Sequence, residues 1–312
     1  MAQKIIDPVP VDDIIQELTP DRKLRDTNKG GNEIYIVNSV NAPNTMREIG
    51  RLREIAFRTA GGGTGKECDI DRYDVMDPPC QQLIVWSPED REIIGGYRFI
   101  LGRDIKMENG HPRIATSHMF DFSERFIKDY LPYTIELGRS FVRLEYQSSR
   151  AGAKAIFALD NLWDGLGALT VLHPEIRYLF GKFTMYPSYD RDCRNMLLYF
   201  LNRHFPDNDD LARPYFPIRG GDGDGRFPEM FPGNSFLEDY RTLNTAIREH
   251  GINIPPLVNA YMSLSPTLRI FGTAINDEFG DVEETGIFLT ISEVYDEKID
   301  RHVNSFHPEK QQ

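Results

Sequence analysis

The chain has 312 residues, a formal net charge of −12 at pH 7, and a hydrophobic fraction of 40%. This length can bury a sizeable core, in one large domain or two small ones. The acidic balance argues against nucleic acid as a partner, because phosphate binding requires a basic surface. Three widely spaced cysteines, Cys68, Cys80 and Cys193, argue against a disulfide framework and favour a reducing compartment.

The first residues, Met1–Pro8, lack the long apolar run of a signal peptide. No stretch of about 18 apolar residues occurs anywhere in the sequence, so we expect no membrane-spanning segment. We therefore expect a cytoplasmic protein, either soluble or peripheral at the inner membrane.

The beginning of the chain is polar, and we expect an N-terminal arm over residues 1–31 with a short helix near Asp12–Leu18. A core follows over residues 32–204, where strand-like and helix-like patterns alternate. Its expected strands are Glu33–Val40, Gln81–Trp86, Ile93–Gly102 and Ile176–Met185, and its expected helices are Asn44–Arg58, Phe122–Tyr130, Ala151–Thr170 and Asp190–Arg203.

Three short runs suggest a phosphate or metal site, but each departs from the required pattern. Ala60–Lys66 has alanine where a phosphate loop needs its first glycine, and Glu67 follows instead of Ser or Thr. Asp69–Asp74 holds three aspartates without a neighbouring His or Glu cluster, which favours ion pairing with the preceding arginine-rich helix. Asp222–Gly225 is followed by arginine at the next calcium-ligand position. We expect no bound metal.

The stretch Ile135–Tyr146 begins as a strand and carries Glu136 and Arg139, a carboxylate and a guanidinium three residues apart. In a flat strand these two side chains would point to opposite faces. Gly138 lies between them, and glycine inside a strand often marks a bulge, which would re-aim one of the charges. We therefore expect a bent strand that carries a Glu136–Arg139 ion pair into a cleft.

After the central strand, the small-residue segment Gln147–Lys154 opens a long helix. A strand–turn–helix junction is a good anion site, because free backbone N–H groups and the helix dipole face outward there. Residues 205–235 are rich in Pro, Gly and Asp, and we expect a long surface loop that could act as a lid.

Residues 236–295 are expected to complete the same domain, and residues 296–312 form a tail. The elements expected in this part are helices at Phe236–His250 and Leu257–Leu264 and strands at Leu268–Ala274 and Gly286–Ile291.

The order of several charged residues resembles a known family. The motifs are, in order, Arg53-x-x-x-Phe57, Asp71-x-x-Asp74, Arg98 on a strand, and Glu136-Leu-Gly-Arg139 followed by Val142. This order is similar to that of the acyl-carrier-protein-dependent N-acyltransferases of the GNAT superfamily. These include the hemolysin-like amino-acid N-acyltransferases of ornithine-lipid and glycine-lipid synthesis and, more distantly, the acyl-homoserine-lactone synthases. The resemblance covers roughly residues 33–289.

The resemblance implies an α/β (α+β) fold with a central, mostly antiparallel, twisted sheet, splayed central strands, flanking helices and a C-terminal elaboration. It also implies transfer of a fatty acyl group, 3-hydroxylated in this family, from an acyl-carrier-protein thioester to the α-amine of a small amino acid. Glycine and ornithine are both open as the acceptor. Such a reaction would be the first step of aminolipid synthesis.

The chemistry assigns roles to the matching residues. N-acylation needs a neutral amine, and Glu136 is the best-placed carboxylate to act as the base, with Arg139 as its catalytic partner. Backbone N–H groups at the bulge could stabilise the developing oxyanion. The remaining family positions would form a substrate-site network that shapes the amine site: Arg53, Phe57, Asp71, Asp74 and Arg98.

The acyl donor is expected to be a carrier-protein thioester rather than coenzyme A. The superfamily's pyrophosphate loop needs spaced glycines, and the corresponding segment here holds only Gly152. Carrier protein is acidic, so docking on this acidic chain needs a local basic patch. We expect Arg143, Arg150 and Lys154 to form it, with Val142 and Gly152 also at the donor site. No bound cofactor is expected.

Two other functions are open at this point. An acyl-homoserine-lactone-type signal synthase would use S-adenosylmethionine and release a lactone. A non-catalytic protein that binds acyl thioesters, or a membrane surface, would leave Glu136→Gln indistinguishable from the wild type.

Overall fold

The computed structural model describes residues 2–147, 153–218, 220–222 and 225–308, without the side chains of residues 153–156. Its strands are β1 (Lys23–Asp26), β2 (Glu33–Val37), β3 (Gln81–Ser87), β4 (Glu92–Leu101), β5 (Met107–Glu108), β6 (His111–Pro112), β7 (Phe120–Phe122), β8 (Thr134–Val142), β9 (Tyr178–Met185), β10 (Ala212–Pro214), β11 (Arg269–Asn276) and β12 (Val282–Thr290). Its α-helices are α1 (Val11–Glu17), α2 (Pro43–Ala60), α3 (Arg72–Val75), α4 (Ala153–Leu172), α5 (Arg191–His204), α6 (Phe227–Met230), α7 (Phe236–Glu249), α8 (Pro256–Met262) and α9 (Asp296–His302).

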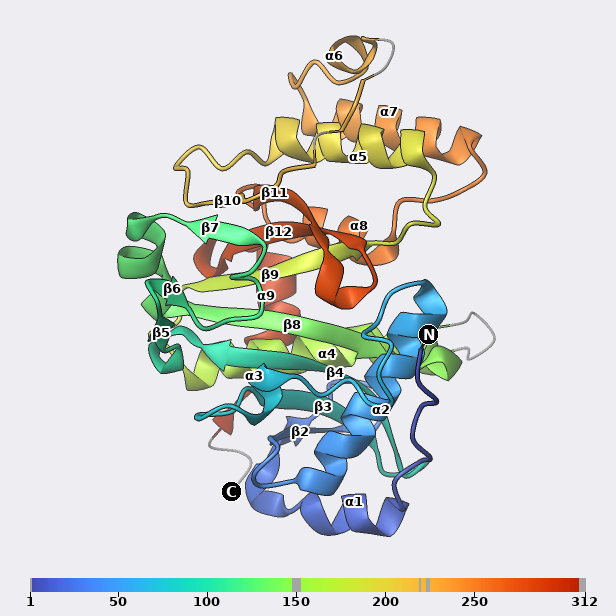
Figure 1. The fold of residues 1–312 in the computed structure, drawn as a ribbon, viewed down its shortest axis with the longest axis vertical. Helices are drawn as coiled ribbons and strands as arrows, with labels where there is room; N and C mark the ends of the chain where they lie inside the picture. The colour runs from blue at the N-terminus through green and yellow to red at the C-terminus, as the bar shows by residue number, and fades with distance from the viewer. Residues whose placement is uncertain (1, 148–152, 219, 223–224, 309–312) are drawn as a thin grey trace.

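An eight-stranded sheet organises the molecule, in the order β1-β2-β3-β4-β8-β9-β12-β11 (Figure 1). Neighbouring strands are antiparallel except for β8 and β9, which are parallel over the short stretch that pairs Thr134 with Tyr178 and Glu136 with Phe180. Beyond these residues β8 and β9 are no longer paired, although both strands continue. The expected mixed α/β fold with a mostly antiparallel sheet and splayed central strands is therefore confirmed.

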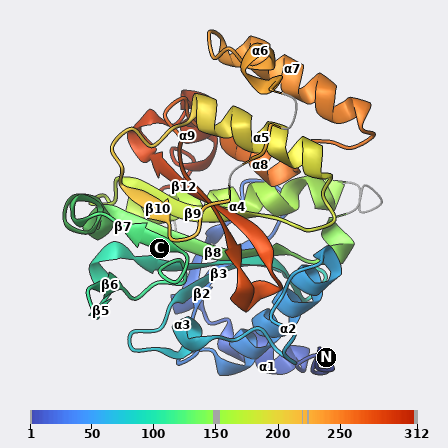
Figure 2. The same cartoon turned by 45° about the horizontal axis from the view of Figure 1, so that its top comes forward.

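Helices cover both faces of this sheet. Strands in its interior, such as β3, are therefore buried on both sides. Along β3, Leu83 and Val85 belong to the core beneath α4, whereas Ile84 and Trp86 belong to the core beneath α2. Alternate side chains of a strand point to opposite faces, so α2 and α4 lie on opposite sides of the sheet. Figures 1 and 2 show α2 in front of the sheet and α4 behind it.

A β-bulge bends β8 next to the point where it leaves β9. Gly96 of β4 lies opposite Phe141, and Arg98 lies opposite Gly138, so β8 holds one residue more than β4 over this interval. Arg139 adopts a φ of 50°, in the left-handed region. The bulge expected from Gly138 is present, but the residue with the unusual backbone conformation is the arginine that follows it.

The ends of the chain take part in the sheet and its covering layers. The segment we expected to be an arm contains β1, which pairs with β2 at the edge of the sheet. The expected tail contains α9, which packs on α4. The expected loop at residues 205–235 contains β10, which pairs with β7, and α6 with its buried Phe227. Among the described residues, no helix combines the length and apolar character required to cross a bilayer.

Candidate active site

A cavity of about 880 Å³ lies where β8 and β9 diverge. Its wall includes Leu137 to Val142 of β8 and Leu179 to Met185 of β9. It also includes Ala56 and Phe57 from α2 on one face of the sheet and residues of α4 on the other. Because α2 and α4 lie on opposite faces, the cavity passes through the sheet by way of the gap between the two strands.

The two ends of the cavity differ in polarity. The end beside α2 carries charged and hydroxyl side chains on the sheet, namely Arg139, Lys182, Thr184 and Glu284. The end beside α4 and α8 is apolar, and its wall includes Leu159, Trp163, Leu166, Leu179, Leu257, Tyr261, Leu264, Ile287 and Leu289. An apolar chain at the α4 side and a charged group at the α2 side could therefore occupy one continuous space.

A chain of ion pairs leads from α2 to the bulge. Arg53 contacts Asp74 at 3.3 Å, and Arg98 contacts both Asp74 at 3.3 Å and Asp71 at 2.7 Å. Asp71 then reaches Arg139 at 3.4 Å. The short helix α3 fixes the two aspartates, because Asp71 and Asp74 form its capping box. The sequence-predicted network residues Arg53, Asp71, Asp74 and Arg98 are thus brought together.

Asp71 is held ionised by its neighbours. Burial would raise the pKa of its carboxyl, but the adjacent guanidiniums of Arg98 and Arg139 outweigh burial and hold the pKa well below its ordinary value. Arg53 and Asp74 are completely buried, and Gln82 donates to Asp74 at 2.9 Å. These residues form the rigid support beneath the polar end of the cavity.

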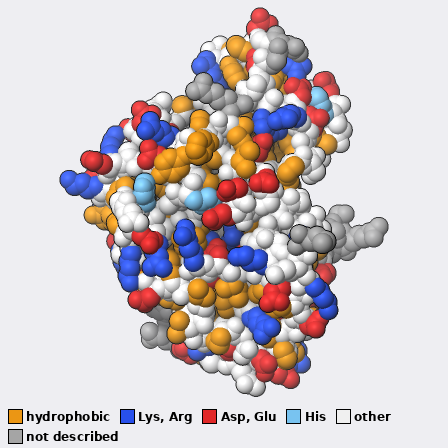
Figure 3. Space-filling model, in the orientation of Figure 1, with side chains coloured by type: hydrophobic (Ala, Val, Ile, Leu, Met, Phe, Trp, Pro, Cys, Tyr) orange, Lys and Arg blue, Asp and Glu red, His pale blue; other side chains and the backbone are white. Residues whose placement is uncertain are grey.

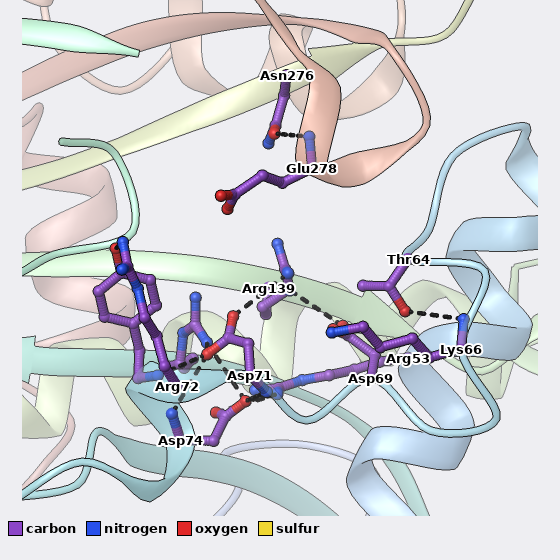
Figure 4. Close-up of polar contacts among 12 residues, drawn as sticks. Arg53, Thr64, Lys66, Asp69, Asp71, Arg72, Asp74, Arg139, Asn276 and Glu278 are labelled. Atoms are coloured by element: carbon purple, nitrogen blue, oxygen red, sulfur yellow. Dashed lines mark hydrogen bonds and ion pairs between the residues drawn. The ribbon is translucent and has the colours of Figure 1, made fainter. Parts of the chain in front are cut away.

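The expected ion pair between Glu136 and Arg139 is not formed. Arg139 contacts Asp69 at 3.0 Å and Asp71 at 3.4 Å, and its guanidinium lies 4.4 Å from the centre of the Phe279 ring. Figure 4 shows the Arg139 side chain between the carboxylates of Asp71 and Asp69. The prediction was wrong about the partner because the bulge turns Arg139 toward the loop before α3, which the spacing within β8 could not reveal.

Glu136 lies beneath the cavity rather than on its wall. Its side chain is 2% exposed, and its Oε1 atom has no hydrogen-bond partner among the described residues. Burial raises the pKa of this carboxyl, against the opposing charges of Arg98 and Lys182. Phe57 does line the cavity and packs edge-on against Phe279, with ring centres 5.0 Å apart.

The residues expected at the donor site are only partly described. Val142 lines the cavity, and its carbonyl accepts a hydrogen bond from Gln147 Nε2 at 2.6 Å. Arg143 is mostly buried and contacts Glu92 and Glu145, so it does not present a free charge. Arg150 and Gly152 lie outside the described residues, as does the side chain of Lys154.

Sequence reasoning missed several polar residues of the site, and their local signals were weak. Asp69 belongs to the run Asp69–Asp74, for which we predicted ion pairing without assigning a role to Asp69 itself. Lys182 is a single lysine within the apolar strand β9, and Glu284 and Asn276 come from β12 and β11, far along the chain. A lone charge in an otherwise apolar strand is the signal that could have indicated Lys182.

Comparison with known proteins identifies the family. Residues 52–156 match the acetyltransferase (GNAT) domain family. The chain is 59% identical to a glycine N(alpha)-acyltransferase of Phocaeicola vulgatus, over 98% of this chain and 95% of the relative. It is 61% identical to a glycine N(alpha)-acyltransferase of Bacteroides thetaiotaomicron, over 98% and 92%.

Two further similarities are more distant. An L-ornithine N(alpha)-acyltransferase of Brucella abortus is 24% identical, over 84% of both chains. Among solved structures, the AHL synthase LasI aligns with 11% identity and a TM-score of 0.43, over 88% of this chain and 96% of that one. The high identity to the first two relatives over nearly the whole chain shows that this protein is a GNAT-domain N-acyltransferase and belongs to the family of these glycine N(alpha)-acyltransferases.

Proposed function

We propose that this enzyme transfers a long-chain acyl group, 3-hydroxylated as in its wider family, from a carrier-protein thioester to the α-amine of glycine. The cavity through the sheet is the observation that supports this most directly, since it joins an apolar end to a charged end. The acyl chain lies between α4 and α8, the thioester lies in the gap between β8 and β9, and the amino acid enters beside α2. Glycine as acceptor rests on the named activity of the two relatives near 60% identity.

The unpaired edge of β8 suits an extended pantetheine arm, which can line a strand edge as an added strand does. The bulge at Arg139 leaves one residue of β8 without an opposite residue in β4. A backbone N–H at such a site can donate to the thioester oxygen as negative charge develops there. Removing one donor of this kind in other enzymes costs on the order of a hundredfold in rate.

Glu136 acts as the proton acceptor through one water molecule. Its unpartnered Oε1 can accept a hydrogen bond from water, and its raised pKa makes it a stronger base than an exposed carboxylate. The glycine ammonium gives one proton to Glu136, and the nitrogen lone pair then forms the C–N bond. The C–S bond breaks, and the departing thiolate takes the second proton from nitrogen. Arg139, held by Asp69 and Asp71, keeps the bulge in place.

The carrier protein docks where basic residues flank the cavity. Basic side chains gather across the middle of the face shown in Figure 3, so a local basic surface exists despite the net charge of −12. We assign docking to Arg150 and Lys154, which follow β8 in the sequence, and not to Arg143, because its charge is already paired with Glu92 and Glu145. The product, an N-acyl amino acid, would be the first intermediate of an aminolipid.

The test is a reconstituted assay with purified protein, acyl carrier protein loaded with a 3-hydroxyacyl chain, and either glycine or ornithine. We expect N-acylglycine by mass spectrometry, far less product from ornithine, and a much higher KM for acyl-coenzyme A than for the carrier-protein donor. The double variant Arg150→Glu/Lys154→Glu should raise the KM for the carrier-protein donor and leave the KM for glycine unchanged. Equal kcat/KM values for the two donors would show that carrier protein is not the preferred donor. The absence of any N-acyl product would reject the proposed function.

A further inference from the structure

Two charged residues of the cavity wall lie outside the ion-pair chain described above. Lys182 on β9 and Glu284 on β12 form an ion pair at the polar end of the cavity. Glu284 also accepts hydrogen bonds from Thr184 Oγ1 at 3.1 Å and from Asn276 Nδ2 at 2.9 Å. The two side chains are 9% and 1% exposed, so the pair is almost wholly removed from bulk solvent although both residues line the cavity.

The stability of the fold does not account for this pair. Taking two opposite charges out of water often costs more than their attraction returns, and apolar residues of similar size usually serve a core better. Phe180, the preceding residue of β9 on the same face as Lys182, follows that rule, since it is buried and hydrophobic. Two charges at this point of the wall therefore indicate a site that meets a charged ligand.

Lys182 has the capacity to bind a second anion. Its ammonium carries three N–H donors, and Glu284 is its only ion-pair partner among the described residues. Arg139, by contrast, is divided between two carboxylates. The ring of Phe279 lies 6.0 Å from the Lys182 ammonium and 4.4 Å from the Arg139 guanidinium. Both cations also line the same cavity. A carboxylate in that space would meet Lys182 directly and the positive charge of Arg139 beside it.

We propose that Lys182 and Glu284 form the acceptor site, in which Lys182 binds the carboxylate of the free amino acid and Glu284 binds its ammonium. This inference rests on the proposed function and names the residues that recognise its second substrate. An amino acid zwitterion carries one charge of each sign, and the pair presents the complementary two. The site lies on the α2 side of the sheet, opposite the apolar end, so the nitrogen approaches the gap from the face that the acyl chain does not occupy.

The test compares glycine with glycinamide, which keeps the amine but replaces the carboxylate by a neutral amide. A charge-assisted hydrogen bond to the carboxylate should give the wild type a kcat/KM roughly 10- to 100-fold higher for glycine. In Lys182→Met this ratio should fall close to one, and Lys182→Arg should restore most of it. Glu284→Gln should raise the KM for glycine and glycinamide alike, because both carry the ammonium.

Controls separate recognition from folding. Lys182→Met leaves the buried Glu284 carboxylate without its ion-pair partner. The double variant Lys182→Met/Glu284→Gln, which carries neither charge, is therefore measured as well. Lys23→Met removes a matched cross-strand pair, Lys23–Glu33 at 2.6 Å, at the far edge of the same sheet and should leave the glycine-to-glycinamide ratio unchanged. A folded double variant that keeps the wild-type ratio would overturn the assignment.

The two proposals can fail separately. If the wild type acylates no amino acid, the proposed function fails, and calorimetric titration of the free protein with glycine still tests the site. Glycine binding that is lost in Lys182→Met supports the acceptor site. Equal binding by both proteins, or no binding by either, overturns it.

Discussion

Arg139 occupies a backbone conformation that usually belongs to glycine, with a φ of 50°. A conformation of this kind costs on the order of 1–3 kcal/mol and persists only where surrounding contacts enforce it. Here the contacts are Asp69 and Asp71, which both precede the first residue of α3, and the ring of Phe279. The strain is thus located just beyond the point where β8 leaves β9, in the part of the strand that forms the cavity wall.

The Glu136→Gln variant should differ from the wild type both in stability and in the way that stability depends on pH. Burial raises the pKa of Glu136 above its ordinary value of 4.5, so the folded protein holds this proton more tightly than the unfolded chain. The wild type therefore loses stability as pH rises from 4.5 through the raised pKa, and the glutamine variant does not. The Tm of the variant relative to the wild type should increase with pH over that window, as followed by thermal unfolding.

The same variant should lose about a hundredfold in kcat, the lower end of the usual effect of a general base. The wild-type kcat should rise with pH as Glu136 ionises, and this limb should be missing from the variant's profile. A Tm difference that is independent of pH would contradict the burial of an ionisable group. An unchanged kcat would remove Glu136 from the mechanism.

At the scale of the element, β8 has two different edges. On one side it pairs with β4 along its length, and Gly95 and Gly96 make that approach close, since a methyl group on Gly95 would lie 2.5 Å from the Phe141 carbonyl oxygen. On the other side it pairs with β9 only as far as Glu136, and a methyl group on Gly138 would meet no atom within 4 Å. The strand is therefore tightly packed behind the cavity and open toward it.

This asymmetry predicts opposite effects for two glycine-to-alanine changes. Gly138→Ala should leave the free energy of unfolding within about 0.5 kcal/mol of the wild type, yet raise the KM for the acyl donor several-fold because Gly138 lines the cavity and its added methyl would project into that space. Gly95→Ala should lower the free energy of unfolding by roughly 1–3 kcal/mol through its clash with β8. Denaturant unfolding and donor kinetics on both variants check this. A strongly destabilised Gly138→Ala would show that the cavity is not open at Gly138.

At the scale of the whole molecule, the apolar end of the cavity is assembled from helices far apart in sequence. A second cavity of about 240 Å³ lies between α4, α8 and α9, and it shares Trp163, Leu166 and Leu264 with the first. The Trp163 ring packs edge-on against Tyr261, with ring centres 6.4 Å apart. Trp163 therefore lies on the boundary between the acyl site and a second space that α9 helps to enclose.

Trp163→Ala should join the two cavities and shift the preferred acyl donor toward longer chains, at a cost in stability on the order of 3 kcal/mol. Competition between carrier-protein donors of different chain length, read by mass spectrometry of the products, measures the shift. Trp86→Ala is the matched control, because Trp86 is buried under α2 on the opposite face and should lose stability without a change in chain-length preference. An unchanged preference in Trp163→Ala would place the chain elsewhere.

Local patterns predicted the helices and strands of the core well, because burial imposes a period on the side chains wherever an element packs against the sheet. The helix expected at Asn44–Arg58 is α2, and the strand expected at Gln81–Trp86 is β3, each within two residues at either end. The expected helix at Phe122–Tyr130 is shorter, a π-helical turn at Phe126–Tyr130 that follows β7, since short segments carry little periodicity.

The sequence alone determined the family, the fold class and the bulge in β8, because those depend on residue types at fixed spacing along the chain. Only the tertiary structure decided which charges meet. Arg139 is paired with Asp69 and Asp71 rather than with Glu136, and the Lys182–Glu284 pair joins residues 102 positions apart. Ion pairs form between whatever side chains the strand order brings within about 4 Å, and the strand order β8-β9-β12 is set by packing of the whole sheet, not by any local stretch.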